Sequence, residues 1–237
     1  MKAILFDSDG VLVDSMPSHY KAWKAAFKEA SDIDVDERTI YLLEGMRGID
    51  LVKKVFELKN YHSDGNISIQ QVADQVSQRK NEIFSDILQT SPPRAYEGVR
   101  DLIANLGVNC KKAVVSGSAK KDVEILLAKA LEKEKNLFDI LITAEDIEKG
   151  KPDPSSFIAA LDKVKISPSE ALVVENAPLG VEAANKGEIE CIVVLNNTPL
   201  TIHDFKSIIE EDRILKETRS AMTVVQDWCI DNGGKQK

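Results

Sequence analysis

Short apolar runs without polar alternation recur along the chain, and the first lies close to its start. The run Ala-Ile-Leu-Phe at residues 3–6 is typical of a strand buried on both faces, as in a parallel sheet. After residue 93, similar runs alternate with helical patterns, which favours a doubly wound sheet. The predicted strands cover residues 3–6, 112–116, 138–143, 171–174 and 189–195, with a weaker one at 213–215.

Residues 15–88 carry only helical periodicity. Trp23 and Phe27 lie about one turn apart on the first predicted helix, and residues 68–89 hold the longest apolar stripe. The sequence Thr-Ser-Pro-Pro at 90–93 ends this pattern, because proline cannot continue a helix. An all-helical segment therefore separates the first predicted strand from the second.

These patterns predict an α/β protein with a doubly wound parallel, Rossmann-like sheet. Residues 1–14 and 89–237 are expected to form the core domain, and residues 15–88 an inserted helical cap domain. Ligands of such sheets gather beyond the carboxyl ends of the strands. The helices expected in the core cover residues 99–106, 120–130, 155–164 and 178–186, with a last one around Met222, Val225 and Trp228.

Composition narrows the class of protein. The net charge of −8 argues against a nucleic-acid-binding surface, which is normally basic. Asp7 interrupts the N-terminal apolar run too early for a signal peptide, and no apolar stretch reaches membrane-spanning length. We expect a soluble, cytoplasmic protein, and no pattern indicates an oligomeric state. Three widely spaced cysteines, Cys110, Cys191 and Cys229, suggest neither a disulfide framework nor a zinc site.

The strongest chemical signal follows the first strand. Asp7 and Asp9 lie two residues apart where the apolar run stops, so their carboxylates can converge. Negative charge beside a buried strand is costly unless a cation compensates it, and hard oxygen ligands suit Mg²⁺. Such a carboxylate can also attack phosphorus. The alternative is ordinary turn chemistry, since Asp and Gly are common turn residues.

Three later strands also end in polar groups. Ser116-Gly117-Ser118 offers a hydroxyl and small residues ahead of a helix N-terminus, which suits an anion, although loops often have this composition. Lys151 stands between a glycine and two prolines and can neutralise phosphate oxygens, or be an exposed lysine in a turn. Glu175 and Asn176 end the next strand, and both side chains can offer oxygen to a cation.

The order of these segments resembles the haloacid dehalogenase superfamily, which consists mostly of phosphatases and phosphomutases. Asp7, Asp9 and Val11 resemble its first motif, Asp-x-Asp-x-Thr/Val. Ser116 resembles the second motif, and the sequence Gly-Lys-Pro-x-Pro around Lys151 the third. Glu-Asn at 175–176 stands where the family usually has two acidic residues, so one charged ligand is replaced by a neutral amide.

This resemblance implies a set of roles. Asp7 is the nucleophile that forms an aspartyl-phosphate, and Asp9 is the general acid and base. Ser116, Gly117 and Lys151 bind the transferred phosphate. Mg²⁺ is the implied cofactor. Its implied ligands are Asp7, the backbone carbonyl of Asp9, and Asn176, with support from Glu175.

Within the superfamily the chain looks most like the β-phosphoglucomutase and small-metabolite phosphatase branch. His19 lies where those mutases carry a histidine, and Lys80 resembles a cap lysine that meets the sugar. On its own pattern, Lys80 either extends to the helix edge or faces a cleft. The mutases' cap arginine is displaced, because Gly48 holds its position and Arg47 precedes it.

The expected function is hydrolysis of a small phosphorylated metabolite, such as a sugar phosphate. A sugar phosphomutase is the first alternative, and a non-catalytic relative that binds phosphate or metal is the second. The substrate-facing residues of the cap are expected to be His19, Arg47 and Lys80.

Overall fold

The computed structural model describes residues 1–63, 67–107, 110–131 and 137–230. Its strands are β1 (Lys2–Asp7), β2 (Cys110–Val115), β3 (Ile140–Ile142), β4 (Ala171–Glu175), β5 (Glu190–Val194) and β6 (Ile214–Leu215). Its α-helices are α1 (Met16–Ser31), α2 (Glu37–Leu42), α3 (Gly48–Leu58), α4 (Ile69–Thr90), α5 (Val99–Asn105), α6 (Lys120–Ala130), α7 (Ser155–Val164), α8 (Pro178–Lys186) and α9 (Thr218–Ile230).

The six strands form one parallel sheet in the order β3-β2-β1-β4-β5-β6. The strand β1 lies at its centre, where Leu5 is level with Ala113 of β2 and Val173 of β4. From β1 the chain builds outwards through β2 and β3, and then returns to build the other side from β4. The carboxyl ends of β1 and β4 therefore meet at a topological switch point, the usual ligand position in such folds.

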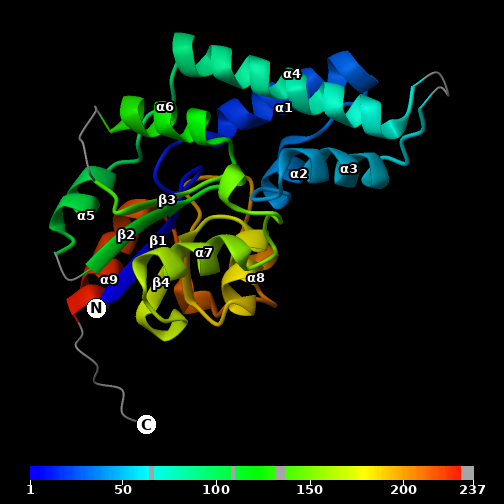
Figure 1. The fold of residues 1–237 in the computed structure, drawn as a ribbon. Coiled ribbons are helices and arrows are strands. Elements are labelled where there is room, and N and C mark those ends of the chain that lie inside the picture. Colours follow the sequence, from blue (N-terminus) through cyan, green and yellow to red (C-terminus); the bar gives the residue numbers. More distant parts are fainter. Residues whose placement is uncertain (64–66, 108–109, 132–136, 231–237) are drawn as a thin grey trace.

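Helices cover both faces of this sheet (Figure 1). On one face, Ile4 and Phe6 of β1 belong to an apolar cluster with α5, α6 and α9. On the other face, Ala3 and Leu5 of β1 belong to a cluster with α7 and α8. Successive side chains of a strand point to opposite faces, so this burial explains why β1 is apolar throughout. The predicted doubly wound α/β core is confirmed.

The helices α1 to α4 form the cap over the carboxyl edge of the sheet (Figure 1). They share a separate apolar cluster that includes Phe27 of α1, Phe56 of α3 and Val76 of α4. The longest helix, α4, begins with a capping box in which Ser68 and Gln71 satisfy each other's backbone N–H groups. An inserted helical cap is thus confirmed, while its division from the core at residues 14/15 and 88/89 stays a prediction.

The structure corrects two expectations. The strand predicted at 138–143 is limited to Ile140–Ile142, because β2 offers it only three partners, Ala113–Val115. Cys110 and Cys229 form a disulfide, which the sequence did not suggest. Their spacing of 119 residues carried no signal, since only the packing of α9 beside the sheet brings them together. Among the described residues, no helix combines the length and apolar composition needed to cross a membrane.

The cap core generates a stability prediction. Phe27 is fully buried and its ring packs against those of Trp23 and Phe56, at centroid distances of 5.7 and 6.2 Å. Phe27→Ala should lower the free energy of unfolding by about 3–5 kcal/mol, because it removes buried apolar surface and leaves a cavity. Leu58→Ala is the control, since Leu58 is 55% exposed. Equal losses for both variants in urea unfolding would contradict the described cap core.

Candidate active site

A lysine lies between two buried carboxylates at the carboxyl ends of β1 and β4. The Nζ atom of Lys151 donates to Asp7 and to Glu175. Each of these three residues is at most 4% exposed to solvent. The second oxygen of Glu175 accepts the backbone N–H groups of Asn176 and Ala177, at 2.9 and 3.1 Å. Glu175 is therefore saturated with donors, and it fixes Lys151 beside Asp7.

Burial dominates the electrostatics of this group. It raises the pKa of Asp7 to about 8, with the charges of Glu175 and Asp9 adding to the rise and that of Lys151 opposing it. Burial also tends to lower the pKa of Lys151, but Asp7 and Glu175 outweigh it and raise that pKa. A nucleophilic carboxylate must be ionised, so additional positive charge near Asp7 would favour its reactive form.

Asp9 has a different set of partners. Its Oδ1 accepts from Ser15 at 2.5 Å and lies 3.0 Å from Nε2 of His19, and its Oδ2 accepts from Ser116 at 3.3 Å. Burial alone would raise the pKa of Asp9, but His19 and Ser15 together lower it to about 2. Asp7 and Asp9 are neighbours whose environments shift their pKa values in opposite directions, an arrangement that is common where two carboxyl groups have different roles.

Two cap residues reach the same place from different helices. His19 of α1 is buried against Asp9 and stacks on Phe84, and burial lowers its pKa, as does the charge of Lys80. Lys80 of α4 is 7% exposed, with its Nζ 5.2 Å from the ring of Trp23 and 4.7 Å from that of Phe84. Burial lowers the pKa of Lys80 to about 8, against the charges of Asp9 and Asp122.

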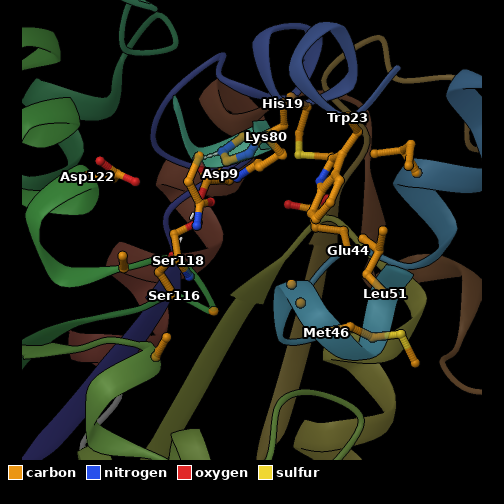
Figure 2. A pocket seen from close by; sticks show the side chains of 18 of the residues that line it. Asp9, His19, Trp23, Glu44, Met46, Leu51, Lys80, Ser116, Ser118 and Asp122 are labelled. Atoms are coloured by element: carbon orange, nitrogen blue, oxygen red, sulfur yellow. Dashed lines mark hydrogen bonds and ion pairs between the residues drawn. The ribbon is translucent and has the colours of Figure 1, made fainter. Parts of the chain in front are cut away.

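These groups line a cavity of about 180 Å³ between cap and core. Figure 2 shows Asp9, His19 and Lys80 together, with Ser116 and Ser118 below them and Asp122, which also lines the cavity, to their left. Of the residues predicted from sequence, Asp7, Asp9, His19, Lys80, Ser116 and Gly117 line this cavity. Lys80 therefore faces the cleft, which decides between the two alternatives that its pattern left open.

Arg47 lies apart from the cavity. It lines a separate surface groove, where its Nη1 donates to the carbonyl oxygen of Glu148 at 2.5 Å. In this structure its guanidinium thus joins the cap to the core, and its predicted contact with substrate stays a prediction.

Glu44 enters the site from the loop between α2 and α3, and the sequence patterns did not single it out. Its Oε2 accepts from Nδ2 of Asn176 at 2.8 Å. Its other oxygen, Oε1, is buried without a hydrogen-bond donor, and so is Oδ1 of Asn176. Burial raises the pKa of Glu44, and the charges of Asp7, Glu175 and Asp9 raise it further. Two adjacent buried acceptors without donors are costly, and a cation would satisfy both.

The two oxygens without donors, on Glu44 and Asn176, bear on whether this site can hold Mg²⁺. Within the described ranges, no group of three or more His, Cys, Asp or Glu side chains is arranged to hold a metal, and Lys151 lies between Asp7 and Glu175. The oxygens of Asn176 and Glu44 nevertheless offer an amide carbonyl and a carboxylate, both hard ligands. With Asp7 beside them, the donor chemistry fits a hard divalent cation.

Sequence reasoning missed three residues of the site. Ser15, Glu44 and Asp122 fall outside the strand ends, where the motifs were sought. Glu44 carried one weak signal, because it precedes Gly45 at a break in the helical pattern. Ser15 and Asp122 resemble ordinary polar residues near helix starts. Ser15 donates to Asp9, and Asp122 lines the cavity from the core helix α6.

Comparison with known proteins agrees with this architecture. A phosphorylated carbohydrates phosphatase from Thermotoga maritima is 25% identical over 89% of this chain and 91% of its own length. A β-phosphoglucomutase from Mycobacterium bovis is 29% identical over 84% of this chain and 82% of its own length. The crystal structure of a hydrolase from Pseudomonas syringae, 24% identical, superposes with a TM-score of 0.83 over 96% of this chain and 99% of that one, which shows the fold.

The family model for haloacid dehalogenase-like hydrolases matches residues 4–194. That range runs from the first strand of the sheet through the cap to the end of β5, and so contains every strand that lines the site. The match covers well over half of the chain, and we conclude that the protein belongs to the haloacid dehalogenase-like hydrolases, a family of enzymes.

Proposed function

We propose that this protein is a magnesium-dependent phosphatase that hydrolyses a small phosphorylated sugar or similar metabolite. The observation that carries the proposal is the placement of Lys151 against Asp7, beside a second carboxyl group with its own hydrogen-bond donors. A buried nucleophile, a fixed cation and a separate acid and base are the parts that phosphoryl transfer needs. The relative from Thermotoga maritima, which is named as a phosphatase of phosphorylated carbohydrates, supports it.

In the first half of the proposed reaction, a carboxylate oxygen of Asp7 attacks phosphorus and the bond from phosphorus to the leaving oxygen breaks. Asp9 gives its proton to that oxygen. The bound phosphoryl group favours the protonated form of Asp9, since a nearby negative charge raises the pKa of a carboxyl group. The products are an aspartyl-phosphate and the free alcohol.

In the second half, water attacks the phosphorus of the aspartyl-phosphate and Asp9 accepts the proton that water loses. Ser15 and His19, which contact Asp9 at 2.5 and 3.0 Å, stabilise the ionised form that this step requires. Inorganic phosphate leaves and the Asp7 carboxylate is restored. In both halves, the oxygens of the transferred group accept hydrogen bonds from Ser116, Gly117 and Lys151. The ammonium group of Lys151 also neutralises part of their negative charge.

Bound Mg²⁺ would supply positive charge to the phosphate oxygens and to Asp7. We propose that Asp7, the backbone carbonyl of Asp9, Asn176 and Glu44 hold it, while Glu175 orients Lys151. Glu44 is the addition to the residues expected from sequence. Its carboxylate, which belongs to the cap, supplies the negative charge that the amide of Asn176 lacks.

Hydrolysis is favoured over mutase chemistry by the charges of the cavity. A phosphomutase must hold a bisphosphorylated intermediate, so a second phosphate needs cations at the cap end. Among the described residues that line the cavity, Lys80 is the only lysine or arginine, and Arg47 donates to Glu148 outside it. Relatives named β-phosphoglucomutase keep the mutase as the second candidate.

The direct test is a screen of phosphorylated metabolites with product identification. We expect release of inorganic phosphate that depends on Mg²⁺. Asp7→Asn should reduce turnover by at least about a thousandfold, because an amide is not a nucleophile. An isomeric sugar phosphate as the product would favour the mutase instead, and an active Asp7→Asn would exclude the covalent mechanism.

The two lysines should affect different parts of the substrate. Lys151→Ala should lower kcat/KM about a hundredfold or more for every phosphate ester, because it removes charge from the group that all of them share. Lys80→Ala should raise KM roughly tenfold for the preferred metabolite, about 1.4 kcal/mol, and spare a small aryl phosphate. Parallel losses for both variants across all substrates would argue against this division.

The proposed roles of Glu44 and Asn176 in Mg²⁺ binding can be tested by exchanging the carboxylate and the amide between the two positions. Glu44→Gln should weaken Mg²⁺ binding roughly tenfold, about 1.4 kcal/mol, because one carboxylate is lost. Asn176→Asp alone should gain little, since it places two carboxylates in contact. The double variant should bind Mg²⁺ about as well as the parent, because it keeps both the total charge and an amide-to-carboxylate hydrogen bond.

Isothermal titration with Mg²⁺ measures these affinities without turnover. Glu37→Gln is the matched control, because it removes the same charge from an exposed position of the cap. If the double variant binds Mg²⁺ as weakly as Glu44→Gln, residues 44 and 176 do not share one cation.

A further inference from the structure

The loop between α2 and α3 contacts the core at the site of Lys151. We refer to residues Gly45–Arg47 as the docking loop. The carbonyl oxygen of Gly45 accepts the backbone N–H of Lys151 at 3.0 Å. At the other end of the loop, Nη1 of Arg47 donates to the carbonyl oxygen of Glu148 at 2.5 Å. The docking loop is therefore hydrogen-bonded at two points, residues 148 and 151, to the core segment that carries this lysine.

Glycines on both surfaces permit this close approach. A Cβ atom on Gly45 would lie 2.6 Å from Cδ of Lys151, and one on Gly150 would lie 2.7 Å from the backbone nitrogen of Arg47. A Cβ on Gly117 would lie 3.1 Å from the oxygen of Gly45. Gly45 also has φ +89°, which other residues rarely adopt. Side chains at these positions would hold the cap away from the core.

The docking loop contacts Lys151, the lysine that lies against Asp7. The aliphatic stem of Lys151 packs on the Cα of Gly45, and its Nζ reaches both Asp7 and Glu175. The backbone N–H of Lys151 and its stem thus depend on the cap, while its charged end lies on the nucleophile. Without the docking loop, Lys151 would lose its contacts with Gly45 and keep only those within the core.

We propose that the docking loop is a positioning element for Lys151, with Arg47 as the residue that fastens the loop to the core. Closing the cap then completes the phosphate site itself, in addition to enclosing the substrate. Arg47 acts through Glu148 and Lys151 and makes no contact with the substrate. The inference rests on the proposed function, because it takes Lys151 as the lysine that binds the transferred phosphate.

The geometry separates this role from that of a substrate ligand. A residue that contacts the leaving group affects some esters and spares others. A residue that positions Lys151 affects every ester by the same factor, because all of them share the phosphoryl group. Arg47→Ala should therefore lower kcat/KM about tenfold on an aryl phosphate and on the preferred metabolite alike, and Arg47→Lys should recover part of the loss by keeping a donor.

Lys149→Ala is the matched control for charge. Lys149 is exposed and lines the same surface groove as Arg47, so its removal changes the charge of the groove and leaves the docking loop fastened. Gly45→Ala is the second variant, since its Cβ would meet Lys151. Its control is Gly107→Ala, where a Cβ has no neighbour within 4 Å.

Hydrogen exchange provides a readout that does not depend on turnover. In the parent with Mg²⁺ and inorganic phosphate, peptides that cover residues 44–48 and 148–152 should be protected. Arg47→Ala and Gly45→Ala should raise exchange in both peptides, and leave the helices of the core unchanged. If the parent hydrolyses no ester, the proposed function fails, and the exchange result alone decides the role of the docking loop.

Three outcomes would overturn the proposal. The first is a loss in Arg47→Ala that is confined to particular leaving groups, which would make Arg47 a substrate ligand. The second is an equal loss in Lys149→Ala, which would assign the effect to the charge of the groove. The third is unchanged exchange at residues 148–152 in both docking-loop variants.

Discussion

The structure depends on neutralising carboxylates that are buried at the carboxyl ends of β1 and β4. Asp7 and Glu175 are almost fully buried there, and buried charge is costly unless it is paired. Lys151 bonds both. This one ammonium group stabilises a buried carboxylate at the end of an apolar central strand, and its positive charge suits the phosphate that the site is proposed to bind.

The fold concentrates chemistry at this point because of its topology. Parallel strands place all their carboxyl ends at one edge, and the return of the chain from β3 to β4 opens a crevice beside β1. The core supplies Asp7, Asp9, Ser116 and Lys151. The cap adds His19, Lys80 and Glu44 from above the same edge. Both parts of the chain therefore contribute side chains to the same group of buried polar residues.

Much of this could be predicted from the sequence, for a definite reason. Apolar runs revealed the strands, and the motifs at Asp7, Ser116 and Glu175 lie at the ends of strands, so their place at the edge of the sheet followed from the fold class. Lys151 follows β3 only after the segment 143–150, and its resemblance to a family motif was the stronger signal. The resemblance then supplied roles for Asp7, Asp9, Ser116 and Lys151. The other features depend on tertiary packing. The docking of Glu44 onto Asn176, the direction of Arg47 and the pairing of Cys110 with Cys229 leave no local pattern.

The most direct test of the account is to look for the covalent intermediate. Asp9→Asn, incubated with Mg²⁺ and a phosphate ester that the parent hydrolyses, should accumulate protein that carries one phosphoryl group, because the variant lacks the base that activates water. Peptide mapping by mass spectrometry should place that group on Asp7. A phosphoryl group on any other residue, or continued turnover without a covalent adduct, would contradict the account.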